Sequence, residues 1–99
     1  MTARNEIFEQ RDQLTLYHFD ACPYCARVRN AIADLGIDDI EFRDIREDKN
    51  AYDELVAARG TRTVPVLRIQ SADGNDQWMP ESADIIRWLE ARSARPVSD

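Results

Sequence analysis

The chain has 99 residues, of which 43% are hydrophobic and 32% charged, as is typical of one small globular domain. Its formal net charge of −6 at pH 7 argues against nucleic acid as a partner, because phosphate binding needs a basic surface. No apolar run approaches the roughly 20 residues that span a bilayer, and residues 1–13 lack the apolar segment of a secretory signal. We therefore expect a monomeric cytoplasmic protein without a membrane partner.

The hydrophobic patterns predict the element order β-α-β-α-β-β-α. The expected elements are a strand over 14–19, a helix over 23–35, a strand over 40–45, a helix over 49–59, strands over 66–70 and 77–79, and a helix over 83–91. A strand, a helix and a second strand imply a right-handed crossover, so the first two strands should be parallel. We predict an α/β domain over 14–92 with a four-stranded mixed sheet and helices on both faces, between an N-terminal arm or short helix over 1–13 and a flexible tail over 93–99.

Single residues mark several of these boundaries. Gly36 and Gly60 follow the first two predicted helices, where a glycine often ends a helix. Asp73-Gly74 favours a hairpin between the last two strands. Ser82 is the predicted N-cap of the last helix, because a hydroxyl at that position accepts a hydrogen bond from the first helical turn.

Cys22-Pro23-Tyr24-Cys25 places two thiols at the turn between the first strand and the first helix. The helix N-terminus favours a thiolate at Cys22, because its unpaired N–H groups and the helix dipole attract an anion. Cys25 begins the apolar face that continues through Val28 and Ile32, so we expect it to be shielded. The motif predicts thiol–disulfide exchange in which Cys22 is the nucleophile and Cys25 the resolving thiol.

Other polar residues around the motif are weaker candidates. Two cysteines and His18 are too few for a closed four-ligand zinc site in one chain, so no metal site is predicted. We interpret His18, on the first strand, as a structural residue rather than a general base. Arg27, Arg29 and Arg62 are the cations that could attract an anionic ligand.

The chain resembles the glutaredoxins, through Cys22-Pro23-Tyr24-Cys25 after a strand and Thr63-Val64-Pro65 about forty residues later. The resemblance covers residues 14–92 and implies a thioredoxin-like fold. It further implies an enzyme that reduces protein disulfides and glutathione mixed disulfides, with glutathione as co-substrate and no permanently bound cofactor. A cis peptide bond before Pro65 is part of the same expectation, because the turn leaves the Val64 backbone free to pair with the cysteinyl part of glutathione.

Two segments depart from the small glutaredoxins. Phe19 stands three residues before the first cysteine, where many of them carry lysine or arginine. The stretch 79–85, Met-Pro-Glu-Ser-Ala-Asp-Ile, is instead similar to the glutathione-binding segment of glutathione transferase N-terminal domains, and to bacterial glutaredoxins that carry a further helical domain. At 99 residues, the chain is expected to be the thioredoxin-like half alone. The resemblance assigns glutathione binding to Tyr24, Arg62, Thr63, Val64, Pro65, Glu81 and Ser82.

Our leading hypothesis is a dithiol glutaredoxin that acts on disulfide-containing or glutathionylated proteins. One alternative is a thioredoxin-like reductase that is recharged by a flavoenzyme instead of glutathione. A third reading is a non-catalytic glutathione-binding module, or one that carries an iron–sulfur cluster shared between two chains through Cys22 and glutathione. Electron transfer from glutathione separates the first hypothesis from the other two.

Overall fold

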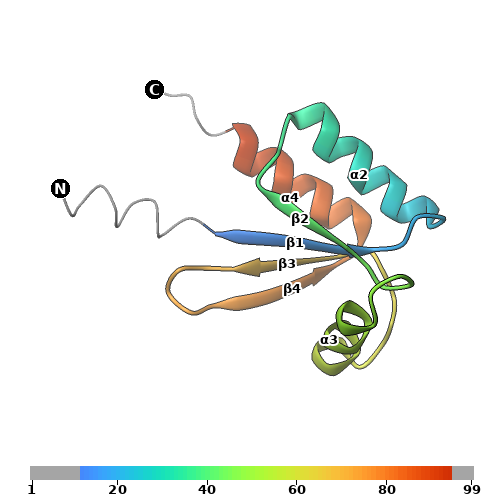
Figure 1. Cartoon of the computed structure of the whole chain (residues 1–99). Helices are drawn as coiled ribbons and strands as arrows, with labels where there is room; N and C mark the ends of the chain where they lie inside the picture. Colours follow the sequence, from blue (N-terminus) through green and yellow to red (C-terminus); the bar gives the residue numbers. More distant parts are fainter. Residues whose placement is uncertain (1–11, 95–99) are drawn as a thin grey trace.

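The computed structural model describes residues 12–94 (Figure 1). Its elements are β1 (Gln13–His18), α2 (Pro23–Leu35), β2 (Ile40–Asp44), α3 (Lys49–Arg59), β3 (Val66–Gln70), β4 (Asp76–Pro80) and α4 (Ser82–Ala94). The predicted α/β class and element order are confirmed. Within residues 12–94, none of the helices has the length and hydrophobicity that crossing a bilayer requires.

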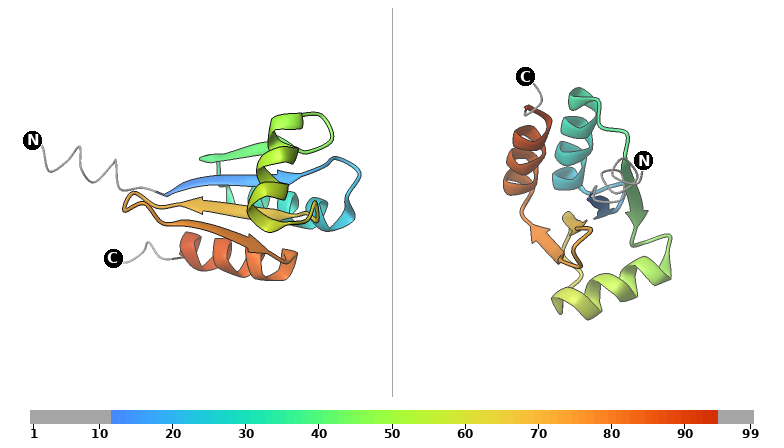
Figure 2. Two further views of the ribbon diagram at one scale, coloured as in Figure 1. Left: turned by 90° about the horizontal axis from the view of Figure 1, so that it is seen from below. Right: turned by 90° about the vertical axis from the view of Figure 1, so that its left-hand side faces the viewer.

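The four strands form one mixed sheet in the order β2-β1-β3-β4. β1 and β2 are parallel, as the right-handed crossover predicted, and β3 is antiparallel to both β1 and β4. Helices α2 and α4 lie side by side on one face of the sheet, and α3 covers part of the other face (Figures 1 and 2). The central strand β1 is therefore enclosed, and all its residues after Gln13 are buried.

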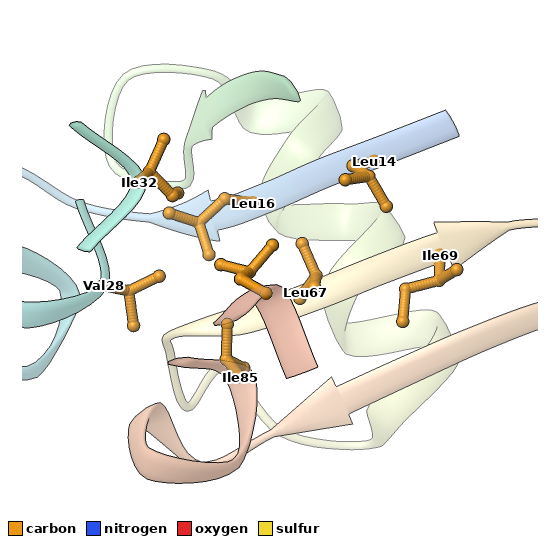
Figure 3. Close-up of a cluster of buried hydrophobic side chains, with 8 residues drawn as sticks. Leu14, Leu16, Val28, Ile32, Leu67, Ile69 and Ile85 are labelled. Carbon is orange, nitrogen blue, oxygen red and sulfur yellow. The ribbon is translucent and has the colours of Figure 1, made fainter. Parts of the chain in front are cut away.

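The main hydrophobic cluster lies between the sheet and the helices α2 and α4 (Figure 3). Its members come from β1, β3 and the inward faces of the two helices: Leu14, Leu16, Val28, Ile32, Leu67, Ile69, Ile85 and Leu89. Each helix contributes two residues spaced four apart, which is the spacing that places side chains on one helical face. This cluster packs both helices against the sheet.

A second cluster lies on the α3 side and extends to the cysteines. Tyr17 is fully buried there and stacks on Trp78, with ring centroids 5.2 Å apart. Its hydroxyl donates a 2.8 Å hydrogen bond to Glu54 Oε1 on α3. Val64 and Cys25 belong to the same cluster, so the packing of α3 on the sheet continues directly into the thiol motif.

The ends of the chain differ from the predicted boundaries. Residues 1–11 of the predicted arm and 95–99 of the predicted tail lie outside the described residues. Gln13, assigned to the arm, belongs to β1, and α4 extends to Ala94 although its apolar pattern stops at Leu89. Arg92 supplies a reason for the extra turn, because it forms a 2.8 Å ion pair with Asp39 in the segment between α2 and β2.

The topology brings four chain segments to one edge of the sheet (Figure 1). Strands β1, β2 and β4 run in the same direction and end at this edge, and β3 begins there. Helices α2 and α4 start at the edge, directly after β1 and β4. Both helix N-termini and the segment before β3 therefore face the same region.

Candidate functional site

Cys22 occupies the N-cap position of α2. Its Sγ accepts a hydrogen bond from the backbone N–H of Cys25 at 3.3 Å, and its own N–H donates to the Phe19 carbonyl at 3.2 Å. Pro23 takes the first helical position, where the missing N–H costs nothing. The sulfur thus lies on the positive end of the helix dipole, in contact with one of the N–H groups that a helix leaves unpaired.

Cys25 lies one turn further and is fully buried, whereas 6% of Cys22 is exposed. Both cysteines are free thiols. Burial raises the pKa of the Cys25 thiol, and its hydrogen bond with Cys22 acts in the same direction. The pair is therefore asymmetric, with one sulfur at the helix end and the other held protonated behind it.

The raised pKa of Cys25 predicts a loss of stability in alkali. An unfolded cysteine loses its proton near pH 8.5, whereas folded Cys25 keeps it, so the free energy of unfolding should fall by up to about 1.4 kcal/mol per pH unit as pH rises above that value. Burial also raises the pKa of Tyr17, so ionisation of this tyrosine lowers the free energy of unfolding only above pH 10.

The measurement is urea unfolding under reducing conditions at pH 7, 8.5, 9.5 and 10. Cys25→Ala should show a shallower decline than the unmodified protein over this range, whatever its stability at pH 7. Parallel declines for the two proteins would contradict the assignment of the alkaline loss to Cys25.

His18 lies at the end of β1 and is buried beside Arg29 of α2. Its Nδ1 accepts a 3.1 Å hydrogen bond from Arg29, and its ring meets Phe42 edge-on with centroids 5.7 Å apart. Burial and the neighbouring guanidinium lower the pKa of His18, so the ring is neutral at pH 7. These contacts support the structural interpretation of His18.

A cavity of about 420 Å³ opens between the start of α2, the segment before β3 and the start of α4. It is lined by Tyr24, Arg59, Thr61, Thr63, Val64, Pro65, Pro80, Glu81 and Ser82. Six of the seven residues assigned to glutathione binding are thus brought together, and Arg62 is not among the lining residues. A larger, open hollow of about 920 Å³ lies at the opposite edge around Asp38 and Gln70. Neither cysteine is a lining residue of either cavity, and Tyr24 is the member of the thiol motif that lines the smaller one.

Arg59 and Thr61 line the cavity although the sequence reasoning passed over them. Arg59 ends α3, and Gly60 follows it with a φ of 73°, a left-handed conformation that glycine adopts without strain. The chain turns at this glycine. A signal was present in the sequence, because Arg59 lies in the last helical turn before a predicted terminating glycine, next to the Thr63-Val64-Pro65 segment.

The segment before β3 carries the expected cis peptide bond between Val64 and Pro65. Both residues are buried, and Val64 packs in the same cluster as Cys22 and Cys25. Upstream, the Thr61 hydroxyl accepts a 3.3 Å hydrogen bond from the Thr63 N–H. The segment is thereby fixed between the thiol pair and the cavity.

The start of α4 differs from the prediction that Ser82 is its N-cap. The Glu81 carbonyl accepts the hydrogen bond from the Ile85 N–H at 3.0 Å, so Glu81 takes the N-cap position and Ser82 is the first helical residue. Glu81 has a φ of 77°, which is uncommon for a residue with a side chain and occurs often at functional sites. The sharp turn after β4 directs the N-terminus of α4 to the cavity wall.

The cavity therefore carries charges of both signs. Glu81 and Arg59 supply a carboxylate and a guanidinium, and the N-terminus of α4 favours an anion. Tyr24, whose side chain is 59% exposed, borders the cavity on the Cys22 side. No group of three or more His, Cys, Asp and Glu residues suited to a metal ion occurs within the described range 12–94.

Comparisons with known proteins identify relatives of this arrangement. Residues 16–96 match the family described as glutathione S-transferase, N-terminal domain, and no curated protein matches the chain. A maleylacetoacetate isomerase from Anaeromyxobacter dehalogenans 2CP-1, solved with bound dicarboxyethyl glutathione and citrate, is 31% identical with a TM-score of 0.65. The similarity covers 89% of this chain and 40% of the isomerase chain, so the chain spans about two fifths of that relative's length.

Two glutaredoxins are similar in fold. The wheat protein is 18% identical, with a TM-score of 0.58 over 89% of this chain and 80% of its own. The glutaredoxin from Archaeoglobus fulgidus is also 18% identical, with a TM-score of 0.60 over 84% of this chain and 91% of its own. They confirm the predicted thioredoxin-like fold. Because the family match spans most of its length, the chain belongs to the glutathione S-transferase N-terminal domain family.

Proposed function

We propose that the protein is a dithiol glutaredoxin, a glutathione-dependent thiol–disulfide oxidoreductase. The observation that carries the proposal is the asymmetric thiol pair, with Cys22 at the N-terminus of α2 and the protonated Cys25 buried behind it. The helix end stabilises the thiolate, which is the nucleophile of disulfide exchange. No permanently bound cofactor is required.

In the first half-reaction, the Cys22 thiolate attacks the glutathione sulfur of a glutathionylated protein. A disulfide bond forms between Cys22 and glutathione, the original disulfide bond breaks, and the protein thiol leaves with the electron pair and takes up a proton. A second glutathione, as thiolate, then attacks the glutathione sulfur on Cys22. Oxidised glutathione leaves and the Cys22 thiolate is regenerated.

A protein disulfide requires the second thiol. Cys22 attacks one of the two sulfurs and forms a mixed disulfide with it, while the disulfide bond breaks and the other protein sulfur leaves as a thiolate and takes up a proton. Cys25 then loses its proton and attacks the Cys22 sulfur, so that the second protein thiol leaves and a Cys22–Cys25 disulfide remains. Two glutathione molecules reduce this disulfide and leave as one oxidised glutathione.

The lining of the cavity supports glutathione as the co-substrate. Glutathione carries two carboxylates and one ammonium group, and the cavity offers groups of opposite charge to both kinds. In our proposal Glu81 binds the γ-glutamyl ammonium, and Ser82 at the helix N-terminus binds the neighbouring carboxylate. The Val64 backbone pairs with the cysteinyl part, and Arg59, which lines the cavity whereas Arg62 does not, binds the glycyl carboxylate.

The first half-reaction can be trapped directly. Cys25→Ser is incubated with oxidised glutathione, and the product is analysed by mass spectrometry after digestion. We expect one glutathionyl group, on Cys22, because the variant cannot resolve the mixed disulfide. A variant that stays unmodified would contradict the proposal.

A second candidate follows from the similarity to the isomerase, which was solved with a glutathione conjugate. In that case the chain would hold glutathione for addition to an electrophilic substrate, and Cys25 would be dispensable. Cys25→Ser would then retain full activity with an electrophile such as 1-chloro-2,4-dinitrobenzene. A non-catalytic module with an iron–sulfur cluster would instead give visible absorption after anaerobic purification.

A further inference from the structure

Arg29 connects α2 to the chain that leaves β1. The sequence named it among the cations that could attract an anionic ligand, but it is not a lining residue of the cavity. Its Nη1 donates to His18 Nδ1 at 3.1 Å and to the Phe19 carbonyl at 3.4 Å. Its Nη2 donates to the Asp20 carbonyl at 3.2 Å. One planar guanidinium thus binds three successive residues of the segment that leads into the thiol motif.

The Phe19 carbonyl links Arg29 to Cys22. This carbonyl, which accepts from Arg29, also accepts the hydrogen bond from the Cys22 N–H at 3.2 Å. Burial raises the pKa of the Cys25 thiol, whereas a hydrogen bond with the Phe19 backbone and the charge of Arg29 lower it. Arg46 packs over the Phe19 ring at 3.9 Å from its centroid and holds the residue from the side chain.

We propose that Arg29 is a positioning residue that holds Cys22 in its exchange geometry through the Phe19 carbonyl, with His18 as the acceptor that orients the guanidinium. The significance of this role for catalysis rests on the function proposed above. The positional effect itself concerns the free thiols and requires no glutathione.

The planar shape of the guanidinium explains why the position requires an arginine. Two nitrogens of the rigid guanidinium plane donate to two carbonyl oxygens and one imidazole nitrogen. A lysine ammonium on a flexible stem does not reproduce this arrangement. His18 can accept only while Nδ1 is unprotonated. Its lowered pKa, due first to burial and then to Arg29, keeps the ring neutral, and Arg29, which can only donate, requires the tautomer with the proton on Nε2. The charged groups that also act on the ring are Asp44 of β2 and Asp20, and both oppose this lowering.

The test compares Arg29→Lys with a matched control, Arg27→Lys, which makes the same change at an exposed position of the same helix. Amide hydrogen exchange at Cys22 reports its bond to Phe19, and alkylation by iodoacetamide from pH 5 to 10 reports each thiol. In Arg29→Lys we expect protection of the Cys22 amide to fall about fivefold, while alkylation of Cys25 stays slow. Arg27→Lys should match the unmodified protein in both measurements.

A merely structural role for Arg29 gives a different result. General loosening of the fold would expose Cys25, so both thiols would be alkylated faster at high pH. That outcome, or wild-type amide protection in Arg29→Lys, would overturn the proposal. In Arg29→Lys we expect iodoacetamide to alkylate Cys25 slowly and Cys22 with an unchanged limiting rate.

A second variant provides the test if Arg29→Lys does not fold. His18→Phe removes the acceptor and leaves the arginine in place, so the Cys22 amide should again lose protection, and wild-type protection would overturn the proposal. His18→Asn supplies an uncharged acceptor near the position of Nδ1 and should restore protection. If Arg29→Lys changes the thiol motif as expected but the protein shows no glutathione-dependent turnover, the proposed function is wrong and the role of Arg29 is still supported.

Discussion

Replacing Cys22 with serine is expected to lower glutathione-dependent disulfide reduction to background, a loss of at least about a thousandfold. A serine hydroxyl stays protonated at neutral pH, so the helix N-terminus has no thiolate to stabilise. Cys25 cannot take over, because it is buried and its pKa is raised. The measurement is turnover of a glutathionylated peptide with the oxidation of NADPH by glutathione reductase as readout.

Cys25→Ser is the matched variant for this prediction. It should keep the reduction of glutathionylated peptides, which needs only Cys22 and free glutathione, and lose most of the reduction of protein disulfides. Equal losses from the two substitutions with a glutathionylated peptide would contradict the assignment of nucleophile and resolving thiol.

Glu81→Gln is expected to raise the KM for glutathione about tenfold, because it removes the negative charge proposed to bind the γ-glutamyl ammonium. The change keeps the size of the side chain and does not alter the left-handed backbone at this position. The free energy of unfolding and the alkylation of Cys22 should therefore stay within error of the unmodified protein.

Glu90→Gln is the control for Glu81→Gln, since it removes the same charge from an exposed position further along α4. Its KM for glutathione should be unchanged. If both variants raise the KM equally, the effect is not specific to Glu81 and the start of α4 has no specific role in binding. An unchanged KM in Glu81→Gln would show that the ligand is held elsewhere.

The sequence predicted the bounds of most elements, because the residues that end helices and form turns stand where the hydrophobic periodicity also stops. Helices α2 and α3 begin and end where predicted, with Gly36 and Gly60 in left-handed conformations after them. The predicted bounds were less accurate where an element is stabilised by a contact with a residue far away in the sequence. The last turn of α4 depends on the ion pair between Arg92 and Asp39, which are far apart in the chain and carry no shared pattern.

The candidate site was predictable in its chemistry but not in all its geometry. The thiol motif and Thr63-Val64-Pro65 lie where the resemblance to glutaredoxins put them. That Arg59 lines the cavity and Arg62 does not depends on the turn at Gly60, whose direction a sequence does not give. The three hydrogen bonds of Arg29 could not be predicted from the sequence either, because an arginine on a helix usually points to solvent.

The most direct test of the proposed function is steady-state reduction of a small glutathione mixed disulfide, coupled to glutathione reductase and NADPH. The unmodified protein should turn the substrate over with glutathione as the only reductant, and Cys22→Ser should not. Turnover that requires a thioredoxin reductase instead of glutathione would contradict the account. So would an inactive protein that binds glutathione normally.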